Sequence, residues 1–182
     1  YPGWKVRFYI DQSIELDFAK KLHEAGAQIY QVTSGLGAFE GMYWRFWVND
    51  DPNVNHYCIR DADSRLNWRE KAAVDEWLAS GNLFHSMRDH KNHNFRIQGG
   101  MWGGTTGFIP NIRKLIAEWN QYSRYCVDQQ FLSTIVWPLV EKTCTVHDTF
   151  HEKKPFPPHK PLQDPTMFVG QIFDEFNNYF PE

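Results

Sequence analysis

Along this chain, short runs of apolar residues alternate with longer stretches in which the apolar residues have helical spacing. Runs rich in aromatic and β-branched residues predict strands, and apolar residues three or four positions apart predict helices. The predicted strands are residues 4–10, 27–32, 57–60, 83–87, 95–98 and 140–146. The predicted helices are residues 14–25, 39–48, 67–81, one beginning after Pro110 and one beginning at Asp128. Such alternation with short connections favours an α/β domain, with a mostly parallel sheet and helices on both faces.

The length and composition of the chain are those of one globular domain. Of its 182 residues, 42% are hydrophobic and 23% are charged, and no linker divides it, so we expect a single domain over residues 1–182. The carboxyl-terminal segment, residues 152–182, begins with a Pro- and Lys-rich stretch that we expect to be extended. The formal net charge of -3 argues against a general attraction to nucleic acid, so an anionic ligand would be held by local groups.

The cysteines and the length of the apolar runs bear on the cellular setting. Cys58, Cys126 and Cys144 each lie in an apolar run and form no metal-type pairs, which indicates reduced core thiols and favours a cytoplasmic setting. No apolar run approaches about 18 residues, so we expect no membrane span. We also recognise no signal peptide.

Two aspartates, Asp61 and Asp63, follow the predicted strand 57–60 directly. At the end of a strand both carboxylates can turn toward one cation, and two carboxylates with room for water and phosphate oxygens suit Mg²⁺ or Mn²⁺. A solvated turn or a helix cap is the alternative explanation of the same residues. Arg60 and Arg65 flank the pair, and each either contacts a pyrophosphate or forms a salt bridge that holds the aspartates in place.

A second group of potential metal ligands and a glycine-rich run follow. The group consists of His85, Asp89, His90 and His93, in a segment that we predict to be a strand and a polar loop. That setting lacks the framework of a zinc site, so a solvated or substrate-lining loop is the alternative. Gly99 and Gly100 allow a close approach of the backbone to a ligand, and Trp102 among the glycines is the aromatic residue that we expect to face a sugar.

Four landmarks occur in a recognisable order along the chain. They are Asp61-Ala62-Asp63, Gly99-Gly100-Met101, Asp128-Gln129-Gln130, and His147 followed by Lys154-Pro155-Phe156. This order resembles the nucleotide-sugar glycosyltransferases of the GT-A fold, most nearly the retaining family that includes glycogenin and bacterial galactosyl- and glucosyltransferases. In that family the signals are Asp-x-Asp, an Asn-x-Gly strand, Asp-Gln-Asp, and His followed by Lys-Pro-Trp. The resemblance extends over roughly residues 4–156.

The resemblance implies roles for these residues. Asp61, Asp63 and His147 would bind Mn²⁺ or Mg²⁺, and His151 is an alternative to His147 as the third ligand. The remaining implied contacts are to the donor: Lys154 to a phosphate, Gly99 and Gly100 to the sugar pocket, and Asp128 and Gln129 to the sugar hydroxyls or the reacting carbon. Arg88, Asp89 and His90 are further candidates for contact with the donor or the acceptor.

The chain departs from the family pattern at three places. Gln130 and Phe156 stand where the family has Asp and Trp, and the His-to-Lys spacing is one residue longer. A GT-A domain also begins with a strand and loop that hold the nucleotide base. Only three strands are predicted before Asp61, so we expect that first strand to be missing.

These observations lead to one expected function and two alternatives. We expect a metal-dependent glycosyltransferase of the hexosyltransferase type, which transfers a sugar from a nucleotide-diphosphate donor to a carbohydrate or other hydroxyl acceptor. The first alternative is a non-catalytic carbohydrate- or nucleotide-binding remnant of such an enzyme. The second is a metal-dependent phosphohydrolase built on the His85–His93 segment together with Asp61 and Asp63.

Overall fold

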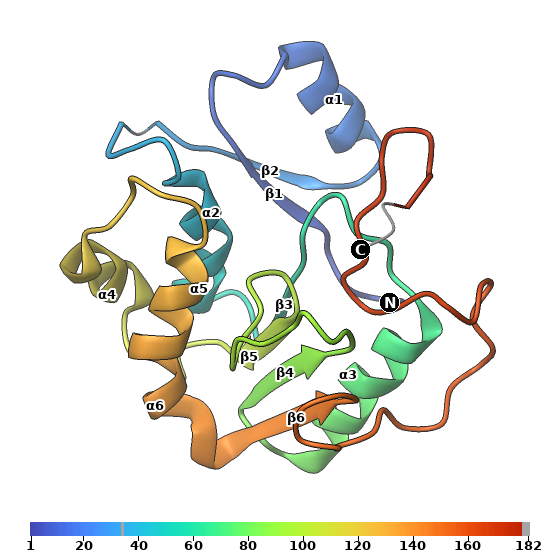
Figure 1. Ribbon diagram of the computed structural model, residues 1–182. Helices are drawn as coiled ribbons and strands as arrows, with labels where there is room; N and C mark the ends of the chain where they lie inside the picture. Colours follow the sequence, from blue (N-terminus) through green and yellow to red (C-terminus); the bar gives the residue numbers. More distant parts are fainter. Residues whose placement is uncertain (34, 180–182) are drawn as a thin grey trace.

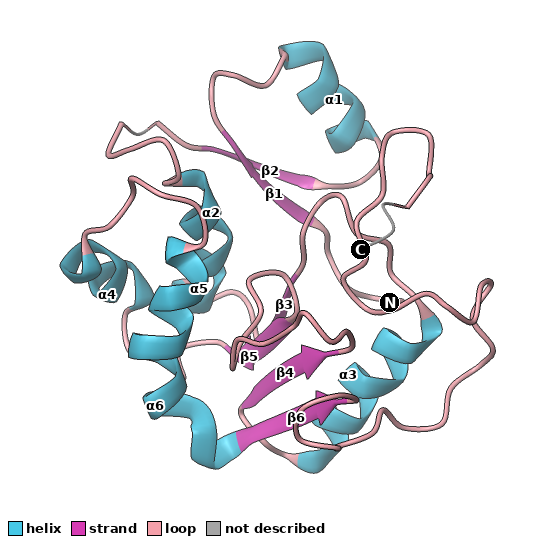
Figure 2. Ribbon diagram, in the orientation of Figure 1, coloured by secondary structure: helices cyan, strands magenta, loops and turns pink. Residues whose placement is uncertain are grey.

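The computed structural model of the protein describes residues 1–33 and 35–179, and it contains two sheets with helices around them (Figures 1 and 2). The strands are β1 (Arg7–Ile10), β2 (Gln28–Gln31), β3 (His56–Ile59), β4 (Phe84–Arg88), β5 (Trp102–Thr105) and β6 (Cys144–Asp148). The helices are α1 (Leu16–Glu24), α2 (Gly41–Trp44), α3 (Trp68–Ser80), α4 (Ile112–Trp119), α5 (Val127–Phe131) and α6 (Trp137–Val140). A 3-10 helix over Arg45–Asp50 continues α2, a π-helical turn over Leu132–Val136 joins α5 to α6, and a 3-10 turn over Glu141–Thr143 precedes β6.

The larger sheet has the strand order β3-β5-β4-β6. Strand β4 pairs in parallel with β6, whereas β5 is antiparallel to both β3 and β4. Therefore β3, β4 and β6 all run in one direction, and their carboxyl ends meet at the same edge of the sheet. The residues that lead into β5, including Gly99 and Gly100, reach this edge as well. Strands β1 and β2 form a separate parallel pair.

Helix α3 covers one face of the larger sheet, and its ends follow from the local sequence. The Asn67 side chain accepts a hydrogen bond of 2.9 Å from the Glu70 N–H at the amino end, and Gly81 adopts a left-handed conformation at the carboxyl end. Between these caps the apolar side chains of Ala73, Val74 and Trp77 are fully buried. The predicted helix 67–81 is therefore confirmed.

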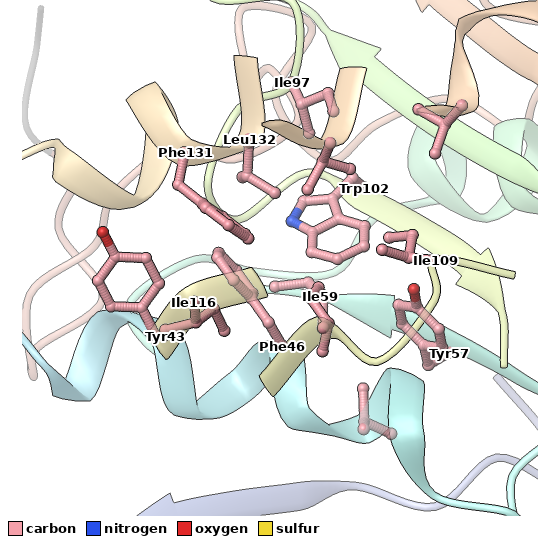
Figure 3. Close-up of a cluster of buried hydrophobic side chains, with 14 of the residues drawn as sticks. Tyr43, Phe46, Tyr57, Ile59, Ile97, Trp102, Ile109, Ile116, Phe131 and Leu132 are labelled. Carbon is pink, nitrogen blue, oxygen red and sulfur yellow. The ribbon is translucent and has the colours of Figure 1, made fainter. Parts of the chain in front are cut away.

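The opposite face of the sheet packs against α4, α5, α6 and the 3-10 helix, and the aromatic side chains meet there (Figure 3). Trp102 is at the centre, with its ring centroid 5.2 Å from those of both Phe46 and Phe84. Because helices lie on both faces and three of the four strands run the same way, the α/β fold class is confirmed.

Two predictions are wrong at β5. Residues 95–98 form bends rather than a strand, because the Arg96 carbonyl accepts hydrogen bonds from the Ser86 hydroxyl and the Arg88 guanidinium instead of from a neighbouring strand. Trp102 does not face a sugar: its side chain is completely buried. On a strand, alternate side chains point to opposite faces, and residue 102 lies on the face that carries the core.

No helix in the described ranges has the length and apolar character needed to span a membrane, and the longest of them, α3, has 13 residues.

Candidate functional site

Carboxylates from two distant parts of the chain converge at the edge where β3 ends. Arg45, in the 3-10 helix, places one guanidinium nitrogen 2.9 Å from Asp128 Oδ2 and the other against Asp61 Oδ1. Its Nε donates to the Met42 carbonyl at 3.1 Å, which fixes the orientation of the guanidinium plane. One positive charge therefore holds two carboxylates side by side, one from the loop after β3 and one from the first turn of α5.

The glycine run forms the wall behind these carboxylates. A Cβ atom added to Gly100 would lie 1.9 Å from Asp61 Oδ2, and one added to Gly99 would lie 2.9 Å from both Arg45 Nη2 and Asp128 Oδ2. The Gly99 N–H also donates to Gln129 Oε1 at 3.3 Å. The structure thus brings together Asp61, both glycines, Asp128 and Gln129, all of them candidates from the sequence.

The two carboxylates differ in their exposure. Asp128 is fully buried, and its Oδ1 has no hydrogen-bond partner among the described residues. Burial raises the pKa of Asp128, and the Arg45 charge opposes that effect. The Asp61 side chain, by contrast, is 47% exposed and accessible to a ligand.

Tyr125 lies at the rim of this group. Its side chain is 73% exposed. Desolvation raises the pKa of Tyr125, and the carboxylates of Asp128, Asp61 and Asp63 raise it further.

Asp63 and Arg65 are connected to the carboxyl-terminal segment. The Asp63 carbonyl accepts from the Phe173 N–H at 2.8 Å, while the Asp63 side chain is exposed to solvent. The Arg65 guanidinium donates to Asn177 Oδ1 at 2.9 Å and lies over the ring of Phe173. The segment from Phe173 to Asn177 therefore passes next to the candidate metal site.

Arg60 points away from the aspartates, into the interface between the sheet and α3. Its Nε is 2.6 Å from Glu70 Oε1, and its Nη1 donates to the carbonyls of Ile59 and Trp102. Arg60 thus forms a buried salt bridge, but its partner is Glu70 and neither of the two aspartates.

His147, His151 and Lys154 lie at or beyond the carboxyl end of β6, which is the outer strand farthest from β3 in the sheet. His147 Nδ1 is 2.9 Å from His85 Nε2, and His147 Nε2 is 3.2 Å from Glu76 Oε1. The exposed Lys154 places Nζ 2.7 Å from Glu152 Oε2. In the described part of the chain, no hydrogen bond or ion pair joins these residues to Asp61 or Asp63.

The residues of the second ligand group have separate partners, although the rings of His90 and His93 contact each other. His85 contacts His147, His93 Nδ1 accepts from the Asp89 N–H at 3.1 Å, and the His90 ring stacks on Phe168. Over residues 1–33 and 35–179, no three or more His, Cys, Asp or Glu side chains are grouped so that they could hold a metal ion. No observation therefore favours the phosphohydrolase alternative.

The Asp89 carboxylate is buried in a network of hydrogen bonds that holds three parts of the chain together. One carboxylate oxygen accepts from Arg69 Nη1 at 2.7 Å and from the Val169 N–H at 3.0 Å, and the other accepts from the Thr149 hydroxyl at 2.9 Å. The side chain is buried, and it connects α3, the loop after β6 and the carboxyl-terminal segment.

We expect Asp89→Asn to lower the free energy of unfolding by about 3 kcal/mol, because it leaves a partly buried Arg69 charge without its partner. Urea unfolding measures this loss. Asp75→Asn, which removes an exposed (i, i+4) pair with Lys71, is the control and is expected to cost less than about 1 kcal/mol. Unchanged donor turnover per folded molecule would contradict a role for Asp89 in donor binding.

Acid is expected to destabilise the fold through its buried histidines. Burial lowers the pKa of His85 well below its usual value and lowers the pKa of His93 to about 4. A group whose folded-state pKa is depressed contributes stability above its unfolded pKa of about 6.5 and loses it as pH falls toward the folded value. For His93 alone the loss is on the order of 3 kcal/mol.

Unfolding free energies measured by urea titration at pH 7 and at pH 5 test this expectation. His93→Gln should flatten the pH dependence, since glutamine can accept from the Asp89 N–H without titrating. His23→Gln, at an exposed position on α1, should leave the pH dependence unchanged. If the unfolding free energy depends on pH equally in the wild type and in His93→Gln, protonation of His93 is not a cause of the loss of stability in acid.

The donor atoms at Asp61 and Asp63 fit a hard divalent cation that also binds a ligand. Mg²⁺ and Mn²⁺ are commonly held by one or two carboxylates together with water and substrate phosphates, so a third protein ligand is not required. Asp61 and Asp63 are two positions apart in the loop after β3 and both are exposed, so their carboxylates are the residues of the site that could supply such ligands.

A cavity of about 580 Å³ opens next to Ala62, between β1, α1 and α2. Its walls are largely apolar and aromatic, and a hydrogen-bonded pair of polar side chains, Asp11 and Ser13, lies at one end. The apolar and aromatic residues that line it include Phe8, Ile10, Ile14, Phe18 and Trp44. It offers a compartment for a flat, partly apolar group beside the two aspartates.

Arg45 and Tyr125 were not among the sequence candidates. The signal for Arg45 is a single cation inside the apolar run of residues 39–48, because a charge within a buried helix requires a partner. The position of Tyr125 has no comparable signal, since it lies in a loop.

Comparisons with known proteins add one structural similarity. Neither models of protein families nor curated proteins match the chain. Among solved structures, the chain is similar to the crystal structure of a glycosyltransferase involved in the glycosylation of the major capsid of PBCV-1. The two share 12% identity over 84% of this chain and 91% of that chain, with a TM-score of 0.49. The identity and the TM-score are both low, so the α/β fold class stated above rests on the helices and strands of this chain.

Proposed function

We propose that the protein is a metal-dependent glycosyltransferase that uses a nucleotide-diphosphate sugar as donor. The observation that carries this proposal is the convergence of Asp61, the Gly99-Gly100 backbone and Asp128 around Arg45 at one edge of the sheet. Side chains from three separate segments meet there beside a cavity, which is the usual arrangement of a binding site in an α/β sheet.

In this proposal Asp61 and Asp63 hold Mn²⁺ or Mg²⁺. The cation supplies neutralisation of the charge that grows on the departing diphosphate. Ala62 between them borders the 580 Å³ cavity, whose apolar and aromatic walls suit a nucleobase.

The remaining residues position the donor sugar. Gly99 and Gly100 present no side chain, so Asp61, Arg45 and Asp128 pack closely against the backbone of the glycine run. Gln129 accepts a hydrogen bond from a sugar hydroxyl, and the buried Asp128 holds the Arg45 guanidinium in place beside it. Arg45 keeps the carboxylates of Asp61 and Asp128 aligned while the donor binds.

A thermal-shift panel of nucleoside diphosphates, each with and without Mn²⁺, tests the binding part of the proposal. A ligand at 100 times its Kd stabilises the folded state by about 2.7 kcal/mol, and we expect a shift that requires both components. Failure of every nucleoside diphosphate to shift the melting temperature with Mn²⁺ would overturn the proposal.

Turnover separates an enzyme from a binding remnant. We expect slow, Mn²⁺-dependent release of nucleoside diphosphate from a nucleotide sugar, with water as the acceptor. Binding without release, for any of the common donor sugars, would support the non-catalytic alternative instead.

A further inference from the structure

A second large cavity, of about 960 Å³, borders the loop that carries the two aspartates. Its walls come from Arg65 and Leu66 in that loop, the first turn of α3, residues 161–167 and the turn 173–179. Figure 1 shows the carboxyl-terminal segment, in orange to red, running past the amino end of α3. Among the described residues, none that lines this cavity also lines the 580 Å³ cavity, so the two are separate compartments.

Hydrogen bonds hold the turn 173–179 in place as one wall of the cavity. The Asp174 carboxylate accepts from two backbone N–H groups of the turn, at 2.9 and 2.7 Å. Arg65 attaches the turn to the aspartate loop, since its Nε and Nη2 donate to Asn177 Oδ1 at 3.1 and 2.9 Å. The wall is therefore preorganised, and a ligand does not have to order it.

Two half-exposed aromatic rings line the cavity. Trp68 is 48% exposed and Tyr179 is 44% exposed, and neither ring belongs to the hydrophobic clusters of the core. The Lys160 ammonium lies 4.3 Å from the ring centroid of Trp68, a cation–π contact that restrains the indole. Flat aromatic faces beside a cavity suit the apolar face of a sugar ring.

Three amide side chains line the cavity together with these rings. They belong to Asn67, Gln163 and Asn177. An amide both donates and accepts hydrogen bonds, as a sugar hydroxyl does. The Oδ1 of Asn67 caps α3, whereas its Nδ2 has no hydrogen-bond partner in the described part of the chain. A lipid chain would offer no partner to these amides, so the combination of rings and amides favours a carbohydrate.

The aspartate loop borders both cavities. Ala62 lines the 580 Å³ cavity and Arg65 lines the 960 Å³ cavity. Asp63 stands between them in the sequence, and its carbonyl accepts from the N–H of Phe173, which also lines the 960 Å³ cavity. A transfer between two substrates requires both to be held next to the reacting centre. With the nucleotide of the donor on the Ala62 side, the Arg65 side is available to the acceptor.

We propose that the 960 Å³ cavity binds the acceptor, and that this acceptor is a carbohydrate with one ring against Trp68. In the transfer, the bond from the anomeric carbon to the diphosphate breaks, and its electron pair leaves with the diphosphate. An acceptor hydroxyl oxygen forms the new bond to that carbon and releases its proton to water. The acceptor role rests on the proposed function, whereas carbohydrate binding by the cavity does not.

Saturation-transfer NMR on the 182-residue chain, without donor or Mn²⁺, tests carbohydrate binding. The probes are trisaccharides of glucose, galactose, mannose and N-acetylglucosamine at millimolar concentration. We expect the ring protons of at least one probe to receive saturation from aromatic side chains. Trp68→Ala should weaken the binding of that probe by about tenfold, the size of a good stacking contact. If none of the probes receives saturation, the cavity is not a carbohydrate site.

Two further variants locate the bound probe. Tyr179→Ala should also weaken binding, and it leaves α3 untouched if Trp68→Ala proves unstable. Phe176 is the matched control, because it lies in the same turn and is 76% exposed but does not line the cavity. Phe176→Ala should bind the probe with wild-type affinity. Wild-type affinity in both Trp68→Ala and Tyr179→Ala would place the probe elsewhere and refute the proposal.

Competition and product analysis test the acceptor role. A nucleoside diphosphate with Mn²⁺ should leave the saturation of the probe in place, because the two ligands occupy different cavities. Displacement of the probe would assign the cavity to the donor. With a nucleotide sugar, mass spectrometry should show the probe lengthened by one sugar, and Trp68→Ala should raise its KM more than it lowers kcat.

The outcomes separate this proposal from the proposed function. Release of nucleoside diphosphate without a lengthened probe would refute the acceptor role alone. Absence of any Mn²⁺-dependent nucleotide binding or release would refute the proposed function and the acceptor role with it. Carbohydrate binding would then stand on the NMR result, which involves neither donor nor cation.

Discussion

Asp61→Asn is expected to lower Mn²⁺-dependent release of nucleoside diphosphate by about 10²–10³-fold, the size of the effect when one preorganised electrostatic group is removed from an active site. The substitution removes the charge that pairs with Arg45, which in the proposed function is also the charge that binds the cation. Because the side chain is half exposed, we expect the fold to remain intact. Asp63→Asn should cause a similar loss of turnover.

The control for this prediction is Asp75→Asn on α3, which removes an equally exposed carboxylate paired with Lys71. Turnover should be unchanged in Asp75→Asn. The melting temperatures of the wild type, Asp61→Asn and Asp75→Asn should agree closely. Retention of wild-type turnover in Asp61→Asn would remove the metal site from the proposed mechanism, whatever the thermal-shift panel shows.

Elements with strong local signals were predictable from the sequence. Helix α3 has a capping residue at Asn67, a C-terminal glycine at Gly81 and apolar residues at helical spacing, so every local preference agrees with the observed helix. Strand β5 has no such agreement, because four of the six residues from 99 to 104 are glycines and the strand contains two of them. Its place between β3 and β4 comes from tertiary pairing, which a local pattern does not encode.

The candidate site was partly predictable, because some of its residues lie in recognisable local motifs. Asp61, Gly99, Gly100 and Asp128 were identified from the order of motifs, and the structure brings them together. Arg45, which links them, comes from a segment that carries none of those motifs.

Some side chains were assigned to the site although they lie elsewhere. Trp102 was expected to face a sugar because it lies among glycines, but those glycines allow close packing of the strand: a Cβ at Gly103 would lie 2.6 Å from the Tyr57 carbonyl. His147 ends a strand at the expected edge, yet its ring is buried between His85 and Glu76. The sequence predicts that a residue lies where the strands end, but it does not predict the direction in which the side chain of that residue points.

Gly100→Ala is expected to reduce turnover by about 10²-fold without removing any functional group, since a displacement of about 1 Å at a reacting centre can have that effect. The added Cβ would lie 1.9 Å from Asp61 Oδ2, 2.4 Å from its Cγ and 2.9 Å from its backbone nitrogen. Rotation of the Asp61 side chain relieves only the first two contacts, so the loop after β3 must move as well. Steady-state kinetics should show the loss in kcat, with the apparent affinity for Mn²⁺ reduced in parallel.

Gly41→Ala is the control for the steric effect of an added methyl group on Mn²⁺ affinity, because its Cβ would meet only ordinary contacts of 3.6 Å or more; Gly41 itself lines the 580 Å³ cavity. If Gly100 acts through Asp61, the double variant Asp61→Asn/Gly100→Ala should be no less active than Asp61→Asn alone, because residues that act through one another have non-additive effects. Additive losses would mean that Gly100 has an independent role, such as direct contact with the donor. Wild-type turnover in Gly100→Ala would show that the close approach of this backbone to Asp61 has no part in the activity.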